Sequence, residues 1–246
     1  NIDGVVNATI RFSSTVTQVD LTSPLPSLTT TGTNIKGVNG PRLSGSAMAS
    51  GSMMTIDTSQ AIIEGLNLIN GVSRDVSVIS GSGNVIRQNT IGTPNDSVST
   101  CISAGITQTS LVGVFVGPAV TGSSAAPSVW IYDNNINCHF GYGIQIDGAD
   151  GAVIGVNHLT SAAAGNYIGT NPSQNTLANG VGIVLNSNGS NGAKNNQIRN
   201  NWIFNQRKEG IWLTGTGTND INGTAANAIT GNKIRRSGLT ASASGI

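Results

Sequence analysis

Charged residues are scarce in this sequence. Lys, Arg, Asp and Glu make up only 9% of its 246 residues, and the net charge is +1. Helices that pack on a core need a polar, often charged outer face, so this composition argues against a mainly helical protein. Nucleic-acid binding requires a concentrated basic surface, so we expect no nucleic acid as partner.

Long apolar runs are also absent. No apolar segment approaches the roughly 18 residues of a membrane-spanning helix, so we expect no membrane span. No signal peptide is recognisable, and a secreted protein with this sequence would be a mature form or a fragment. No charged or Pro-rich linker interrupts the chain, so we predict a single domain over residues 1–246.

Aromatic residues are few, at 4%, whereas glycine is abundant, with 33 residues. This balance is typical of many short strands joined by tight turns. The wealth of Ser, Thr, Asn and Gly beside little Lys and Glu resembles an extracellular protein. We therefore expect a secreted, extracellular or cell-surface location.

Cysteine occurs only twice, as Cys101 and Cys138, with 36 residues between them. An even pair in a secreted β-rich chain is compatible with one disulfide, and two buried free thiols are the alternative. Neither cysteine has a CxxC partner, and the adjacent His139 would point the other way in a strand, so we expect no metal site. His139 and His158 are interpreted as surface or loop residues, since neither belongs to a nucleophile motif.

One short pattern of Asn and apolar residues returns along the chain. Segments 84–91, 196–203 and 227–234 share one spacing of Asn, apolar, Asn, apolar positions. Segment 129–136 keeps both apolar positions and the second Asn, and segment 61–68 keeps the apolar positions alone. Recurrent self-similarity of this kind is the signature of a solenoid.

The spacing of these copies predicts the size of one coil. The differences between successive anchor numbers are 23, 45, 32, 35 and 31, which indicates a basal coil of roughly 23 residues with insertions, above all in the range 94–128. Apolar residues alternate at period two within each copy, so the copies are strands. We predict an all-β fold, a single-stranded right-handed parallel β-helix. The anchors are Leu66, Asn89, Asn134, Asn166, Asn201 and Asn232.

The repeats also predict what lies inside and what lies at a corner. Each Asn between two apolar positions fits a corner where its amide bonds the Asn of the coils above and below, and where Asn tolerates left-handed backbone. We expect a structural asparagine ladder of Asn89, Asn134, Asn166, Asn201 and Asn232. We expect one continuous core that contains Ile86, Ile91, Ile131, Ile136, Ile168, Ile198, Ile203, Ile229 and Ile234.

The segment Gly165-Asn166-Tyr167-Ile168-Gly169-Thr170 and the similar residues 89–93 resemble a family, the secreted bacterial right-handed β-helix proteins with Gly-Asn-Tyr-Ile-Gly-Thr repeats and a pectate-lyase-like fold. Residues 21–29 resemble the segment that opens such repeats. The resemblance implies the fold and leaves function open, because β-helices carry unrelated activities.

Members of that family usually place a capping segment before the strand equivalent to residues 8–12, and here seven residues precede it. Uncapped solenoid ends expose strand edges and apolar rungs and favour end-to-end association. We therefore expect a head-to-tail homo-oligomer, and the alternative is that capping segments lie outside this sequence. The candidate assembly ends are Val6, Ile10, Ile234, Arg235 and Arg236.

An enzyme is the alternative, because polysaccharide lyases and hydrolases share the β-helix fold. The catalytic candidates are Asp133, Asp147, Asp150 and Arg199, and Ca²⁺ would be required only under this alternative; otherwise no cofactor is expected. Residues 147–151, Asp-Gly-Ala-Asp-Gly, have the composition of a turn. This favours a structural role for Asp147 and Asp150, and we lean against an enzyme.

A carbohydrate-binding module is a further alternative. Trp130 and Trp202 occupy matching repeat positions beside a core isoleucine, which predicts that they point outward, where aromatic rings could stack on sugars of an extracellular polysaccharide. The main hypothesis is an extracellular structural or adhesive subunit that assembles end to end into a filament or matrix. Residues 190–246 carry a net charge of +5 and residues 1–189 a net charge of −4, so the chain is electrically polar along its axis.

Overall fold

The structure is a computed structural model. It describes residues 8–37, 40–93, 101, 110–123, 125–155, 165–170, 177–188, 192–215 and 226–235. The elements in these ranges are strands, and all of them pair in parallel within three sheets. This arrangement confirms the prediction of an all-β parallel β-helix.

Two of the sheets contain eight strands each. Sheet A consists of β1 (Thr9–Arg11), β3 (Asn34–Lys36), β6 (Ile62–Glu64), β9 (Asn84–Arg87), β12 (Val129–Tyr132), β15 (Ala152–Gly155), β18 (Gln197–Arg199) and β21 (Ala228–Thr230). Sheet B consists of β2 (Gln18–Asp20), β4 (Arg42–Ser44), β7 (Asn67–Ile69), β10 (Thr90–Ile91), β13 (Asn135–Ile136), β16 (Tyr167–Ile168), β19 (Trp202–Phe204) and β22 (Lys233–Arg235).

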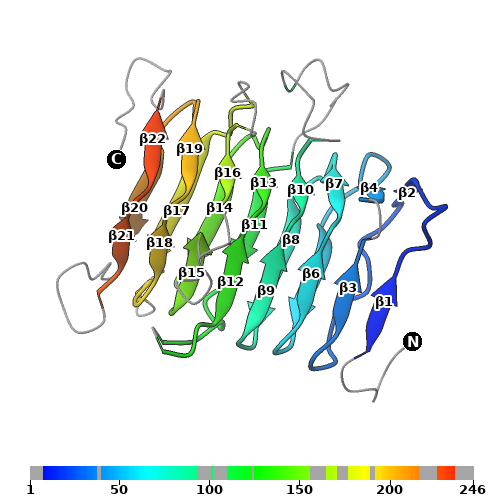
Figure 1. The fold of residues 1–246 in the computed structure, drawn as a ribbon, viewed down its shortest axis with the longest axis horizontal. Helices are drawn as coiled ribbons and strands as arrows, with labels where there is room; N and C mark the ends of the chain where they lie inside the picture. Colours follow the sequence, from blue (N-terminus) through cyan, green and yellow to red (C-terminus); the bar gives the residue numbers. More distant parts are fainter. Residues whose placement is uncertain are drawn as a thin grey trace.

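The third sheet has six longer strands. Sheet C consists of β5 (Ser52–Asp57), β8 (Arg74–Ser80), β11 (Val112–Val116), β14 (Tyr142–Asp147), β17 (Val181–Ser187) and β20 (Ile211–Gly215). Among the described residues, the first coil, with β1 and β2, and the last coil, with β21 and β22, contribute no strand to sheet C, whereas the six coils between them run through sheets A, B and C in turn. In Figure 1 sheets A and B rise on the near side while the coils advance from β1 at the right to β21 and β22 at the left, so the winding is right-handed.

The register places one apolar column of each sheet in the interior. In sheet A, Ile35, Ile63, Ile86, Ile131, Ile154 and Ile198 follow one another on neighbouring strands and are each at most 5% exposed. Of the nine predicted core isoleucines, Ile234 is partly buried against the core and Ile229 is 36% exposed. The prediction is wrong for Ile229 because β21 is the last strand of its sheet among the described residues. The other seven are fully buried.

The size of the coils varies because loops are inserted at the corners. The sequence separation between the paired neighbours Glu64 and Arg87 is 23, whereas that between the paired Arg87 and Tyr132 is 45. Of the insertion-rich residues 94–128, the described part contributes the single strand β11, which pairs with β8 and β14. The long interval therefore enlarges one coil.

The corner between sheets A and B carries the asparagine ladder. In Asn89, Asn134, Asn166 and Asn201 the backbone N–H and Nδ2 donate to Oδ1 of the ladder Asn in the next coil over 2.9–3.2 Å. Nδ2 also donates to a core carbonyl of the preceding coil over 2.8–3.0 Å. The structure thus places Asn89, Asn134, Asn166, Asn201 and Asn232 one above another.

The left-handed backbone lies elsewhere than expected. It occurs one residue before the ladder, at Gln88, Asp133 and Asn200, with φ between 54° and 57°. The expectation that the ladder Asn itself adopts this conformation is wrong. The preceding residue makes the sharp bend, and the ladder Asn then directs its amide along the inside of the corner.

Candidate functional site

The structure does not bring the four catalytic candidates together. Asp133 lies at the A–B corner and accepts a hydrogen bond from Gln88 Nε2 at 3.3 Å, while Arg199 ends β18 in sheet A. Asp150 precedes β15 and accepts one from the backbone N–H of Lys194 at 2.8 Å. These side chains are spread over different faces, and Asp150 is occupied in holding the next coil.

Asp147 is the fourth candidate and lies on the outside of sheet C. It accepts a hydrogen bond from Asn186 Nδ2 at 2.7 Å. Burial lowers the pKa of Arg74, and the negative charge of Asp147 opposes this shift. The Arg74 guanidinium carbon lies 3.4 Å from the centre of the Phe115 ring. Asp147 therefore belongs to a surface network of polar and cation–π contacts.

Metal binding finds no support in the described residues. No group of three or more His, Cys, Asp or Glu side chains there could hold a metal ion. The same part of the chain has no helix long and apolar enough to cross a membrane.

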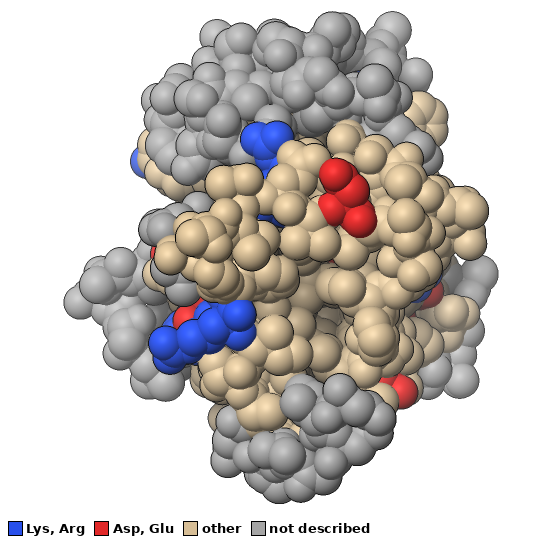
Figure 2. Space-filling model, turned by 90° about the vertical axis from the view of Figure 1, so that its right-hand side faces the viewer, with Lys and Arg blue, Asp and Glu red and all other residues tan. Residues whose placement is uncertain are grey.

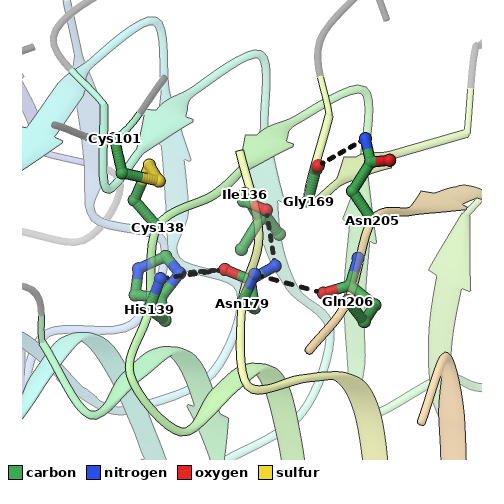
Figure 3. The surroundings of a disulfide bond; sticks show 8 residues. All are labelled: Cys101, Ile136, Cys138, His139, Gly169, Asn179, Asn205 and Gln206. Atoms are coloured by element: carbon green, nitrogen blue, oxygen red, sulfur yellow. Dashed lines mark hydrogen bonds between the residues drawn. A yellow bond between two sulfur atoms is a disulfide. The ribbon is translucent and has the colours of Figure 1, made fainter. Parts of the chain in front are cut away.

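The two cysteines form a disulfide. Cys101 and Cys138 are bonded, with their Cα atoms 5.6 Å apart. Cys138 lies at the corner between sheets B and C, where it has a φ of 64° (Figure 3). The bond therefore ties the insertion of one coil to the corner of the next.

Beside the disulfide lies a fully buried polar network that sequence reasoning did not find. His139 follows Cys138, and its ring contacts Asn179 Oδ1 through Nδ1 and Asp75 Oδ2 through Nε2, both at 2.9 Å. Asn179 N–H in turn donates to Gln206 Oε1 at 3.3 Å (Figure 3). His139 lies in the loop between β13 and β14, so the interpretation as a loop residue is confirmed, but a surface position is wrong because His139 and Asp75 are both fully buried. His158 lies outside the described residues.

The surrounding backbone fixes the protons of this network. Asn179 Nδ2 donates to the Ile136 carbonyl at 3.1 Å, and Asn179 Oδ1 accepts from the His139 backbone N–H at 3.0 Å. The amide is thus oriented with its oxygen toward the ring, so His139 Nδ1 carries a proton and donates it.

Glycines make room for this network. Asp75 lies opposite Gly113 in the sheet register, and Gly143 and Gly182 continue the same column. A Cβ atom at Gly113 would lie 2.8 Å from His139 Cε1, and one at Gly71 would clash with Asp75 Oδ1. The one sequence signal for this buried network was therefore Asp75, which stands at a position that is Gly in the later coils.

The aromatic side chains do not form one surface. Trp130 lies in β12 of sheet A, whereas Trp202 lies in β19 of sheet B, so the prediction of matching repeat positions is wrong. Trp202 packs between Tyr167 and Phe204, with ring centres 5.7 and 5.5 Å away. Lys233 Nζ covers the Trp202 ring at 4.2 Å, which leaves less of this ring for a sugar.

A charged row follows the outside of sheet A. Glu64 forms ion pairs with Lys36 at 2.8 Å and with Arg87 at 2.6 Å. Arg87 also donates a hydrogen bond to the Tyr132 hydroxyl at 3.0 Å. Partial burial alone would raise the pKa of Glu64, but the two cations outweigh it and the pKa is lowered. The hydrogen bond to Tyr132 raises the pKa of Arg87.

The first coil opens into an apolar groove. Its volume is about 610 Å³, and its lining residues come from β1 and the residue after it, from β3, and from the segment between β2 and β3. Figure 2 shows this end of the molecule, where most of the described surface carries neither basic nor acidic side chains. Ile10, the first member of the sheet A core column, is 37% exposed here. The apolar lining residues are Ile10, Phe12, Leu25, Pro26, Leu28 and Ile35.

The opposite end of the solenoid also exposes core residues. Ile229, the last described member of the same column, is 36% exposed, and Ile234 of sheet B is only partly buried. Arg235 is exposed beside it. Of the predicted assembly ends, Val6 and Arg236 lie outside the described residues.

Comparison with known proteins adds no family. A scan against protein-family models finds no match, and a search of curated proteins finds none either. The resemblance to secreted β-helix repeat proteins therefore stays a prediction.

Proposed function

We propose that this chain is an extracellular structural or adhesive subunit that assembles end to end into a filament or matrix. The single observation that carries this proposal is the exposure of one core column at both ends. Interior members of the column are at most 5% exposed, whereas Ile10 and Ile229 are 37% and 36% exposed. Covering each of them contributes about 1 kcal/mol or less of hydrophobic free energy, and the apolar groove beside Ile10 adds to it.

Two further features support this function. The disulfide favours an oxidising location, since such bonds persist in secreted proteins. The end strands β1 and β21 each pair on one side only among the described strands, and an unpaired parallel edge is a template for another strand.

The alternatives have weaker support. An enzyme needs converging acidic or basic groups, and Asp133, Asp147, Asp150 and Arg199 do not converge. A carbohydrate-binding module needs accessible aromatic faces, and Lys233 lies over the ring of Trp202. The ends of the solenoid therefore provide the better-supported surface.

Sedimentation velocity at micromolar concentration tests the proposal. Ile10→Lys and Ile229→Lys should each shift the protein toward monomer, because a charge would be buried in the contact. Ile79→Lys is the matched control, since Ile79 is 38% exposed but belongs to β8, away from both ends. A wild-type protein that stays monomeric, or equal effects of all three substitutions, would contradict the proposal.

A further inference from the structure

The register of the end-to-end contact is encoded in the end strands. We infer that β1 of one copy pairs in parallel with β21 of a second copy, with Ile10 opposite Ile229, while β2 pairs with β22, with Val19 opposite Ile234. This register places Asp20 of one copy beside Arg235 of the other. The inference rests on the proposed assembly, and it names the partner surface as the opposite end of the same chain.

The interior columns select this register. Sheet A runs from Ile10 to Ile229, and sheet B runs from Val19 to Ile234, each with one core residue per strand. A shift by one residue would turn these side chains outward. A shift by two would place Val19 opposite Asn232 and would interrupt the sheet B column. Only one register continues both columns together.

The backbone groups that β1 and β21 direct to their free edges also agree with this register. Ala8 carbonyl and Phe12 N–H bond to β3, so Thr9 and Arg11, which alternate with them, direct their backbone groups to the free edge of β1. At the other end, Ala228 N–H and Thr230 carbonyl bond to the preceding coil, so Ile229 faces outward. Ile229 can then bond between Thr9 and Arg11 of the next copy, as each core residue does inside the solenoid.

The charges on sheet B match in this register. Asp20 and Arg235 are both exposed, and they would be direct cross-strand neighbours. Lys233 would lie opposite the uncharged Gln18, so no like charges are opposed in sheet B. A cross-strand pair of opposite charge adds modest stability and disfavours wrong registers.

The inference does not require a continuous third sheet. Pro24 and Pro26 lie in the first coil where it runs beside β5, and the Leu25 N–H there bonds to the Met53 carbonyl. Proline has no N–H to offer a strand on its other side. The contact is therefore assigned to sheets A and B.

Charge reversal tests the register separately from assembly itself. Asp20→Arg and Arg235→Asp should each weaken association of the full-length chain roughly three- to tenfold, because like charges then face each other. The double variant should return to within about twofold of the wild type. Asp20→Arg combined with Arg199→Asp has the same net charge, and this control should not recover, since Arg199 is in the interior strand β18.

The outcomes separate the two claims. If the wild type assembles but the double variant shows only the sum of the single losses, the register is wrong and the proposed function stands. If the wild type does not assemble, the proposed function fails first. Thermal unfolding of each variant shows whether a loss reflects misfolding.

Disulfide trapping gives a readout that does not depend on charge. Arg11→Cys with Thr230→Cys puts cysteines at directly opposed positions in this register, and oxidation should yield covalent multimers. Thr9→Cys with Thr230→Cys is two residues out of register, beyond the Cα separation that a disulfide tolerates. Preferential cross-linking of this second pair would overturn the inference.

Discussion

The two corners that flank sheet B hold the coils together in different ways. At the A–B corner, the same side chain bonds to its own kind in successive coils, from Asn89 to Asn232. At the B–C corner, different polar residues meet, namely Asp75, His139, Asn179 and Gln206. The A–B corner thus repeats one hydrogen-bonding arrangement in every coil of the ladder, whereas the arrangement at the B–C corner differs from coil to coil.

This difference decides where a substitution is most harmful. A ladder distributes its hydrogen bonds evenly, so the loss of one member leaves the other coils paired. The B–C network buries an ionisable pair that only its own members satisfy, and removal of one partner leaves the other buried without compensation. The irregular corner should therefore be the more sensitive of the two.

The largest effect is expected for His139→Ala. It leaves the Asp75 carboxyl group buried without a partner and should destabilise the fold by about 4 kcal/mol. Chemical denaturation measures this loss. The double variant Asp75→Gly with His139→Asn gives the two positions the residue types found at the same places in later coils, Gly113 and Asn179, and it should recover a substantial part of the lost stability. A double variant as unstable as His139→Ala would show that the pair is not the source of the sensitivity.

Opening the disulfide should have the next largest effect. Its cysteines are separated by 37 residues in sequence, for which loop-closure entropy gives a stabilisation of up to about 4 kcal/mol. We expect the Cys101→Ser, Cys138→Ser variant to unfold at lower denaturant concentration, and reductant to have no further effect on it. An unchanged midpoint would indicate that the B–C corner holds without the bond.

Removing a central ladder residue should cost less. Asn134→Ala leaves the Ile86 carbonyl and the Asn89 N–H without their buried partners and should destabilise the protein by about 3 kcal/mol. Asn232→Ala at the last described rung should cost only about 1 kcal/mol, since Asn232 is less buried. Equal losses in a denaturation experiment would show that position along the ladder does not matter.

The smallest effect concerns Glu64 on the outside of sheet A. Its pKa in the folded state is lowered from the ordinary 4.5, so its ion pairs stabilise the fold above that pH. This contribution is lost as the pH falls through the lower folded pKa. Glu64→Gln should reduce stability at neutral pH by less than about 1 kcal/mol and should flatten the decline between pH 5 and 3. A Gln variant with the same acid profile as the wild type would assign the decline to other carboxylates.

The same contrast explains what the sequence predicts. The A–B corner was predictable because Asn recurs at one offset from apolar residues that alternate, so a local pattern determines a repeated environment. Asp75 and His139 are 64 residues apart, and they meet only because Gly113 of the intervening coil has no side chain in the way. No local pattern contains that information. Trp130 and Trp202 were assigned to matching positions for a related reason. Each directly precedes a core isoleucine, and this local sequence is the same in strands of sheet A and of sheet B.

The axial repeat of the assembled protein tests end-to-end association most directly. The described residues of each copy contribute eight strands to sheet A, so continuous stacking of these strands at about 4.8 Å per strand predicts a repeat of about 38 Å. Fibre diffraction or electron microscopy of assemblies formed at micromolar concentration measures this repeat. A repeat of this length would agree with head-to-tail continuation of the coils, whereas isolated particles one subunit long, or a repeat twice as long from alternating orientations, would contradict it.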